Sequence, residues 1–208
     1  MSKQNCRMAA IQMVSGPRVA DNLVVAGHLI ADAVAQGAQL VVLPEYFPVI
    51  GAVDADRVNA REDFGRGPIQ DWLAATAQRY GIWVFAGSIP LTATVADKMR
   101  NSSLAYNPAG ECVARYDKVH LFGFNKGEES YDEAAFIEAG NQPVAVATPF
   151  GRIALSICYD LRFPELYRAL APVDLILVPA AFTDTTGRAH WEILLRARAV
   201  ENQCYLLA

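Results

Sequence analysis

Short apolar runs alternate with longer amphipathic stretches along the chain. In the stretch 20–36, apolar or small residues recur at steps of four, three and four residues, which is the spacing of one helix face (Leu23, Gly27, Ile30 and Val34). Further helices are predicted at 69–80, 164–170 and 190–202. The short apolar runs predict buried strands at 7–13, 40–43, 82–89, 175–178 and 205–207.

Proline and glycine mark the ends of strands and two hairpins. Pro90 is expected to close the strand 82–89, because proline lacks the N–H that a sheet requires. The strand pairs 102–107 with 112–116 and 144–147 with 153–157 are each separated by a short segment containing proline and glycine. Alternation combined with hairpins predicts an α/β fold with a mixed sheet and helices on the outside.

Composition limits the class of protein. The chain has 208 residues, of which 53% are hydrophobic and 19% charged, so we expect a single globular domain over residues 1–208. The net charge of −4 and the absence of a basic stripe argue against a nucleic-acid partner. No apolar run approaches the roughly 18 residues of a membrane span, and the first residues lack the apolar region of a signal peptide. A cytoplasmic location without membrane contact is therefore expected.

The spacing of cysteines and histidines gives no sign of a metal or cofactor site. Four cysteines and three histidines lie far apart and match no zinc-binding pattern. The glycine-rich motifs of dinucleotide and phosphate binding are also missing from the sequence. We therefore expect neither a metal nor a cofactor.

Three predicted strand ends each carry one reactive side chain. Glu45 follows the strand 40–43, Lys118 ends a hairpin strand, and Cys158 ends the strand 153–157. A carboxylate can take the proton of a thiol, and a lysine ammonium favours both the thiolate and an oxyanion on an attacked carbon. The backbone N–H of Tyr159 is a second candidate donor to that oxyanion. Taken singly, each residue also has a non-catalytic interpretation. Cys158 could be a small buried hydrophobic residue, Glu45 a helix cap or surface charge, and Lys118 a solvated strand end.

The stretch 121–140 is a further candidate for function. It mixes glycine and acidic residues with aromatic ones and shows no clear period. A loop of this length in a compact domain is more often functional than purely structural.

Together these segments resemble the nitrilase, or carbon–nitrogen hydrolase, superfamily. The matching segments are Leu43-Pro44-Glu45, Tyr116-Asp117-Lys118-Val119-His120-Leu121-Phe122 and Cys158-Tyr159-Asp160-Leu161-Arg162-Phe163-Pro164-Glu165. The resemblance implies a four-layer αββα sandwich with mixed sheets that often dimerises, so a homodimer or higher homo-oligomer is expected. It also implies that Glu45 is the general base, Lys118 the stabilising cation and Cys158 the nucleophile. Members usually continue beyond the position of Leu207, so the usual C-terminal segment is expected to be lacking.

The resemblance also implies further site residues. The family often has a second glutamate after the lysine, and Glu133 fits it best, with Glu129 as the alternative. Arg162 is a candidate for a substrate carboxylate, or for a structural ion pair with an acid such as Glu165. His190 and Trp191 have either a pocket role or a packing role at the start of a helix.

The segment 187–205 is most similar to the amidase branch of this superfamily. The resemblance implies hydrolysis of a small linear amide, of the deaminated-glutathione or keto-acid type, to an acid and ammonia through a cysteine thioester. An N-carbamoyl amino acid hydrolase or a nitrilase on the same three residues is the alternative enzyme. A catalytically idle member that serves as a binding module is the alternative that is not an enzyme.

Overall fold

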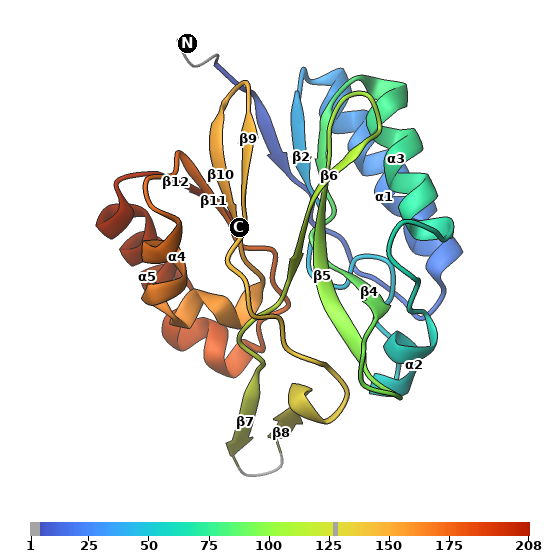
Figure 1. Ribbon diagram of the computed structural model, residues 1–208, viewed down its shortest axis with the longest axis vertical. Helices are drawn as coiled ribbons and strands as arrows, with labels where there is room; N and C mark the ends of the chain where they lie inside the picture. The colour runs from blue at the N-terminus through green and yellow to red at the C-terminus, as the bar shows by residue number, and fades with distance from the viewer. Residues whose placement is uncertain (1–4, 127–128) are drawn as a thin grey trace.

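Four layers build the structure, two sheets face to face with helices on both outer sides (Figure 1). The computed structural model describes residues 5–126 and 129–208, apart from the side chains of Lys126 and Glu129. Helices α1 (Val19–Ala35) and α3 (Pro68–Tyr80) cover one sheet, while α4 (Pro164–Leu170) and α5 (Asp184–Asn202) cover the other. The predicted αββα sandwich is confirmed.

The first sheet combines parallel strands with a hairpin. Its strands are β1 (Met8–Ala10), β2 (Leu40–Val42), β3 (Trp83–Phe85), β4 (Ile89–Thr92), β5 (Met99–Tyr106) and β6 (Cys112–Asp117). Strands β1, β2 and β3 run parallel, and β5 pairs antiparallel with β3, β4 and β6. The predicted hairpin is therefore β5 and β6, and it delivers Lys118 one residue after its second strand ends.

The second sheet is smaller and also mixed. Its strands, in spatial order, are β12 (Tyr205–Leu207), β11 (Leu175–Leu177), β10 (Gly151–Leu155) and β9 (Ala145–Thr148). The pairs β10–β11 and β11–β12 are parallel, and β9–β10 is the second predicted hairpin. After β10 the chain enters a 3-10 helix, η2 (Cys158–Arg162), which leads directly to α4.

The sequence of strand β2 is apolar at every position, and its place in the structure explains why. Leu40 and Val42 point into the core between the two sheets, while Val41 and Leu43 pack toward α1 and α3. Alternate residues of a strand face opposite sides, and both sides of this sheet are covered. Neither face of β2 contacts solvent, so its sequence shows no alternation of apolar and polar residues.

Two predicted elements, the strand 82–89 and the last helix, differ from the structure. The expected strand 82–89 is two strands, because the chain breaks at Gly87 (φ 60°), where a Cβ would lie 2.1 Å from the carbonyl oxygen of Leu43. Pro90 does not end a strand but lies inside β4, which is an edge strand where a missing N–H is tolerated. The last helix begins at Asp184 rather than at His190, since Thr183 caps it by accepting the N–H of Thr186.

The irregular stretch 121–140 contains local structure that its sequence does not predict. It forms a small antiparallel pair, β7 (Gly123–Lys126) and β8 (Glu129–Asp132), followed by the 3-10 turn η1 (Glu133–Ala135). A short helix, α2 (Asp54–Asn59), lies in the first half of the chain and was also not predicted. Among the described helices, none has the length and apolar character needed to cross a membrane.

Candidate active site

Glu45 is buried where strand β2 gives way to a turn. Only 3% of the residue is exposed, and both carboxylate oxygens are held by hydrogen bonds. The side-chain amide of Asn101 donates to Oε1 at 3.1 Å, and the backbone N–H of Ala181 donates to Oε2 at 2.8 Å. Asn101 belongs to the first sheet and Ala181 follows β11 of the second, so this carboxylate is fixed by both sheets. The interpretations as a helix cap or a surface charge do not hold.

Lys118 is the charged centre of the site. It is 1% exposed, and its Nζ donates to Oε1 of Glu45 at 3.0 Å and to the two oxygens of Glu133 at 2.9 and 2.8 Å. Burial by itself lowers the pKa of Lys118, but the surrounding acidic groups, with the Glu45 carboxylate first among them, raise this pKa well above the ordinary value. The lysine is therefore a permanent cation, not a solvated strand end.

Glu133 is the second carboxylate on Lys118. Its Oε2 also accepts the backbone N–H of Phe122 at 2.7 Å, and its Oε1 accepts the hydroxyl of Tyr46 at 3.1 Å. The side chain of the alternative, Glu129, lies outside the described residues. Two carboxylates and one ammonium thus share one buried cluster, with backbone and hydroxyl donors balancing the remaining negative charge.

Cys158 is buried beside this cluster at a strained position. Its φ of 51° is left-handed, which is uncommon for a residue with a Cβ and is typical of functional turns. Its N–H donates to the carbonyl of Pro179 at 2.9 Å, which ties the turn to the segment after β11. Burial, and then the charge of and hydrogen bond to Glu45, hold the pKa of Cys158 well above that of an ordinary thiol, although Lys118 lowers it. The resting cysteine is therefore a protonated thiol with a carboxylate at hand to take its proton.

The raised pKa of Cys158 predicts how stability depends on pH. A group whose pKa is higher in the folded than in the unfolded chain contributes stability that is fully present below the unfolded pKa and is lost as pH rises through the folded pKa. Above pH about 8.5, we expect the free energy of unfolding of the wild type to fall more steeply than that of Cys158→Ala, by up to about 1.4 kcal/mol per pH unit. Urea unfolding at steps from pH 7 to 10 measures both slopes, and equal slopes would contradict the prediction.

A small cleft opens onto the sulfur of Cys158. Its cavity volume is about 20 Å³, and its walls are formed by Phe122, Cys158, Tyr159, Arg162, Ala181, Phe182, Thr183 and Thr186. The ring of Tyr159 packs edge-on against Phe122 at 5.3 Å. In the part of the chain that the structure describes, the backbone N–H of Tyr159 has no hydrogen-bond partner. It is therefore free to donate to an oxygen bound in the cleft.

Arg162 lines the cleft, whereas His190 and Trp191 stand behind it. The guanidinium of Arg162 lies over the rings of Tyr159 and Phe182, each at 5.6 Å, and its Nη1 is 3.2 Å from Nδ1 of His190. No carboxylate among the described residues pairs with Arg162, so the alternative interpretation of this residue, a structural ion pair with an acid such as Glu165, finds no support among them. Trp191 packs against Phe182 at 4.7 Å. His190 and Trp191 lie inside α5 and reach the cleft only through these neighbours.

Several groups that hold the site were not identified from sequence. They are Tyr46, Asn101, Asp160 and the backbone N–H groups of Phe122 and Ala181. A sequence signal for Asn101 exists, because asparagine is depleted in strands and its presence within a buried strand indicates a specific role. Its Oδ1 has no partner among the described residues, so the amide serves Glu45 alone. The backbone donors carry no sequence signal.

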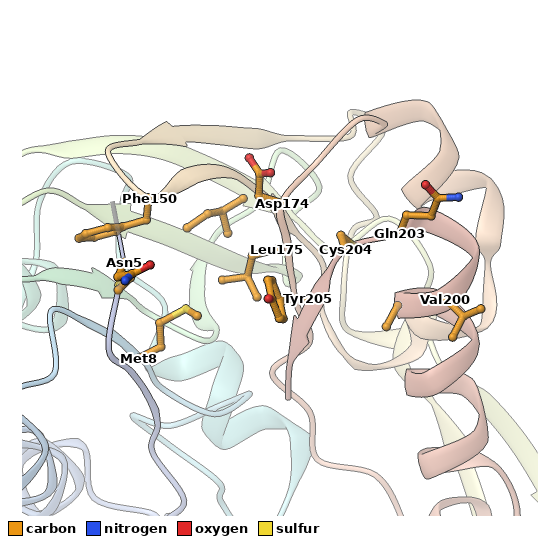
Figure 2. A pocket seen from close by; sticks show the side chains of 12 residues that line it. Asn5, Met8, Phe150, Asp174, Leu175, Val200, Gln203, Cys204 and Tyr205 are labelled. Carbon is orange, nitrogen blue, oxygen red and sulfur yellow. The ribbon is translucent and has the colours of Figure 1, made fainter. Parts of the chain in front are cut away.

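A wider hollow lies elsewhere and has different chemistry (Figure 2). Met8, Phe150, Leu175 and Tyr205 line it between β1 and the edge of the second sheet. None of Glu45, Lys118 and Cys158, which we call the triad, lines this hollow. Apolar side chains dominate its walls. Within the described residues, no group of three or more histidine, cysteine or acidic side chains is arranged to hold a metal ion.

Comparison with known proteins agrees with this geometry. The family model described as carbon-nitrogen hydrolase matches residues 7–208. A deaminated glutathione amidase from Yersinia enterocolitica is 40% identical over 99% of this chain and 73% of its own, and one from Synechocystis is 43% identical over 96% and 75%. The omega-amidase of Homo sapiens is 35% identical over 96% of this chain and 72% of its own.

Solved structures share the fold as well. The crystal structure of the C. elegans NitFhit protein matches with a TM-score of 0.87 at 35% identity over 97% of this chain, which spans only 50% of that one. A mutant of the amidase from Nesterenkonia sp. AN1 matches with a TM-score of 0.77 at 30% identity, over 97% of this chain and 78% of that one. That structure shows Michael addition of acrylamide at its active-site cysteine.

These likenesses define the class, the nitrilase superfamily of enzymes. The chain belongs to the carbon–nitrogen hydrolase family, as the three sequence motifs predicted.

Proposed function

We propose that the chain hydrolyses a small linear amide to an acid and ammonia, with Cys158 as nucleophile. The observation that carries this proposal is the buried cluster in which Lys118 bridges Glu45 and Glu133, directly beside the thiol. The cluster supplies a proton acceptor, a fixed cation and a nucleophile within one small cleft, and these are the groups that acyl transfer from an amide requires.

The first half of the reaction forms a thioester. Glu45 takes the proton of the Cys158 thiol as the sulfur bonds to the amide carbon. Lys118 and the N–H of Tyr159 stabilise the negative charge that develops on the carbonyl oxygen. Glu45 then gives the proton to the nitrogen, the C–N bond breaks, and ammonia leaves. A protonated resting thiol suits this order, because the proton is removed only when an electrophile is in place.

The second half returns the enzyme to its resting state. A water molecule takes the place of ammonia and gives a proton to Glu45 while its oxygen attacks the thioester carbon. The C–S bond breaks, the thiolate regains the proton from Glu45, and the acid is released. Glu133 keeps Lys118 in place throughout, since it accepts two of the ammonium hydrogen bonds.

Arg162 supports an amide whose far end carries a carboxylate. Its guanidinium faces the cleft without an acidic partner among the described residues, and arginine binds carboxylates with two parallel hydrogen bonds. Deaminated glutathione and keto-acid amides both carry such a group, and similar proteins are named deaminated glutathione amidase and omega-amidase.

Ammonia release from a panel of substrates tests the proposal. The panel holds deaminated glutathione, a keto-acid amide, the same amide with a methyl group in place of its carboxylate, an N-carbamoyl amino acid and an aliphatic nitrile. We expect turnover of one or both carboxylate-bearing amides, with kcat/KM lower by roughly 10- to 150-fold for the methyl analogue because a charged hydrogen bond is lost. An Arg162→Met variant should remove that discrimination.

The other outcomes separate the alternatives. Release of carbon dioxide with the ammonia would favour a carbamoyl substrate, and consumption of the nitrile would favour a nitrilase. Cys158→Ala is the blank for every substrate. Turnover of none of the five compounds by the wild type would overturn the proposal and favour a member that binds ligands without catalysis.

A further inference from the structure

A single buried carboxylate contacts both the segment that carries Lys118 and the segment that carries Cys158, which we call the two arms of the active site. Asp160 lies two residues after Cys158 in η2 and is 0% exposed. Tyr116, His120 and Ile157 bind its two oxygens through four contacts. We propose that Asp160 is a positioning residue. It fixes the position of Lys118, which follows a strand of the first sheet, relative to Cys158, which follows a strand of the second.

On the lysine side, Asp160 binds one residue before Lys118 in the chain and one residue after it. The hydroxyl of Tyr116, two residues before the lysine, donates to Oδ2 at 2.7 Å. The backbone N–H of His120, two residues after it, donates to Oδ1 at 3.0 Å, and Nδ1 of the same histidine is 2.8 Å from that oxygen. The His120 ring also stacks on Phe163 at 3.7 Å. The lysine backbone is thereby fixed on both sides.

On the cysteine side, Asp160 binds the residue that precedes the nucleophile. The N–H of Ile157 donates to Oδ2 at 2.9 Å, and the N–H of Cys158 donates in turn to Pro179. Because Lys118 follows β6 of the first sheet and Cys158 follows β10 of the second, the carboxylate of Asp160 spans the two sheets. A shift of either arm would break bonds to the same group.

The arrangement requires a carboxylate and not merely a side chain of this size. Each oxygen of Asp160 accepts one backbone N–H, from His120 on Oδ1 and from Ile157 on Oδ2, and a backbone N–H cannot turn round to become an acceptor. An asparagine has the same shape but would place its NH₂ group against one of these two donors. One bond would become a repulsion, so one arm would move.

Movement of either arm changes the distance between the Lys118 ammonium and the Cys158 sulfur. Misplacement of a catalytic group by about 1 Å can cost roughly 100-fold in rate. The inference rests on the proposed function in treating Lys118 and Cys158 as reacting partners. Its test therefore includes a reaction of the cysteine that requires no turnover.

Alkylation of Cys158 by iodoacetamide provides that test. The rate is followed for the peptide containing Cys158 by mass spectrometry, so that the other three cysteines do not interfere, at steps from pH 7 to 10.5. Lys118 lowers the pKa of the Cys158 thiol. Asp160→Asn should therefore shift the rise in rate to higher pH, and kcat for the amide should fall by about 100-fold. A looser structure alone would change the rate at every pH without moving the rise.

Three further variants complete the experiment. In a Lys118→Met background, Asp160→Asn should shift the profile no further, because the cation through which it acts is gone. Tyr116→Phe removes one of the four contacts and should give a smaller effect of the same kind, even where Asp160→Asn fails to fold. Asp174→Asn is the matched control, since Asp174 accepts the backbone N–H of Arg152 away from the triad, and it should leave the profile unchanged.

Two results would overturn the inference. One is an Asp160→Asn variant with an unaltered alkylation profile and kcat. The other is a shift of equal size with and without Lys118, which would show that Asp160 acts on the cysteine by another route. Failure of the proposed function looks different, because the wild type would then release no ammonia while the alkylation profiles still respond to Asp160.

Discussion

Replacement of Cys158 with alanine is expected to abolish amide hydrolysis while the fold is retained. Without the sulfur no thioester forms, and loss of a nucleophile that acts as a unit with its base typically lowers kcat by about 10⁴-fold or more. The fold should persist because alanine, like cysteine, carries a Cβ, so the left-handed backbone at φ 51° is no more strained than before.

The matched control for this variant is Cys204→Ala. Cys204 is half-buried in the wider hollow, away from the triad, and its removal should leave turnover near that of the wild type. Ammonia release measures activity, and circular dichroism measures the fold. Turnover of Cys158→Ala within tenfold of the wild type would remove this residue as the nucleophile.

Replacement of Lys118 with methionine should cost both activity and stability. Methionine is unbranched like lysine and one atom shorter, but it lacks the charge, so the carboxylates of Glu45 and Glu133 are left buried without a cation. Removal of one partner from a buried ion pair typically costs about 3–5 kcal/mol of unfolding free energy. Turnover should fall with it, because the oxyanion loses its cation and the base loses its anchor.

Urea unfolding and ammonia release measure the two effects of Lys118→Met. Arg196→Met is the control for loss of a charge, since Arg196 and Glu192 form an exposed pair on α5. That control should change the unfolding free energy by no more than about 0.5 kcal/mol. An equal, small loss of stability in both variants would mean that the buried cluster does not hold the site together.

Much of the site could be predicted because its three reactive residues follow strand ends that the sequence marks clearly. Predicted strands end just before Glu45, Lys118 and Cys158, and ligands of open sheets gather at the carboxyl ends of strands. Glu133 was reached through the family resemblance and does contact Lys118. Its position in a short 3-10 turn was not predictable, because the surrounding stretch has no hydrophobic period.

The groups that hold the reactive residues could not be predicted. Ala181 and Phe122 act through backbone N–H groups, which every residue except proline possesses. Asp160 and His120 are 40 positions apart in the chain, and only the packing of the two sheets brings them together. Pair contacts of this kind depend on register between sheets, which local patterns do not encode.

The errors in secondary structure have local causes. The first turn of α5 contains Thr185, Thr186 and Gly187, which are poor helix formers, and the cap at Thr183 outweighs them. Gly87 interrupts a run that reads as one strand. The expected homodimer or higher homo-oligomer and the cytoplasmic location stay predictions.

The placement of base and nucleophile on opposite sheets has a wider consequence. Glu45 and Lys118 come with the first sheet, and Cys158 and the Ala181 donor come with the second, so neither half of the sandwich contains a working site. Chemistry exists only while the two halves are joined. We therefore expect the catalytic rate to report on the contact between the two halves, and a partly opened molecule to be inactive, because its Cys158 thiol would be separated from the Glu45 carboxylate.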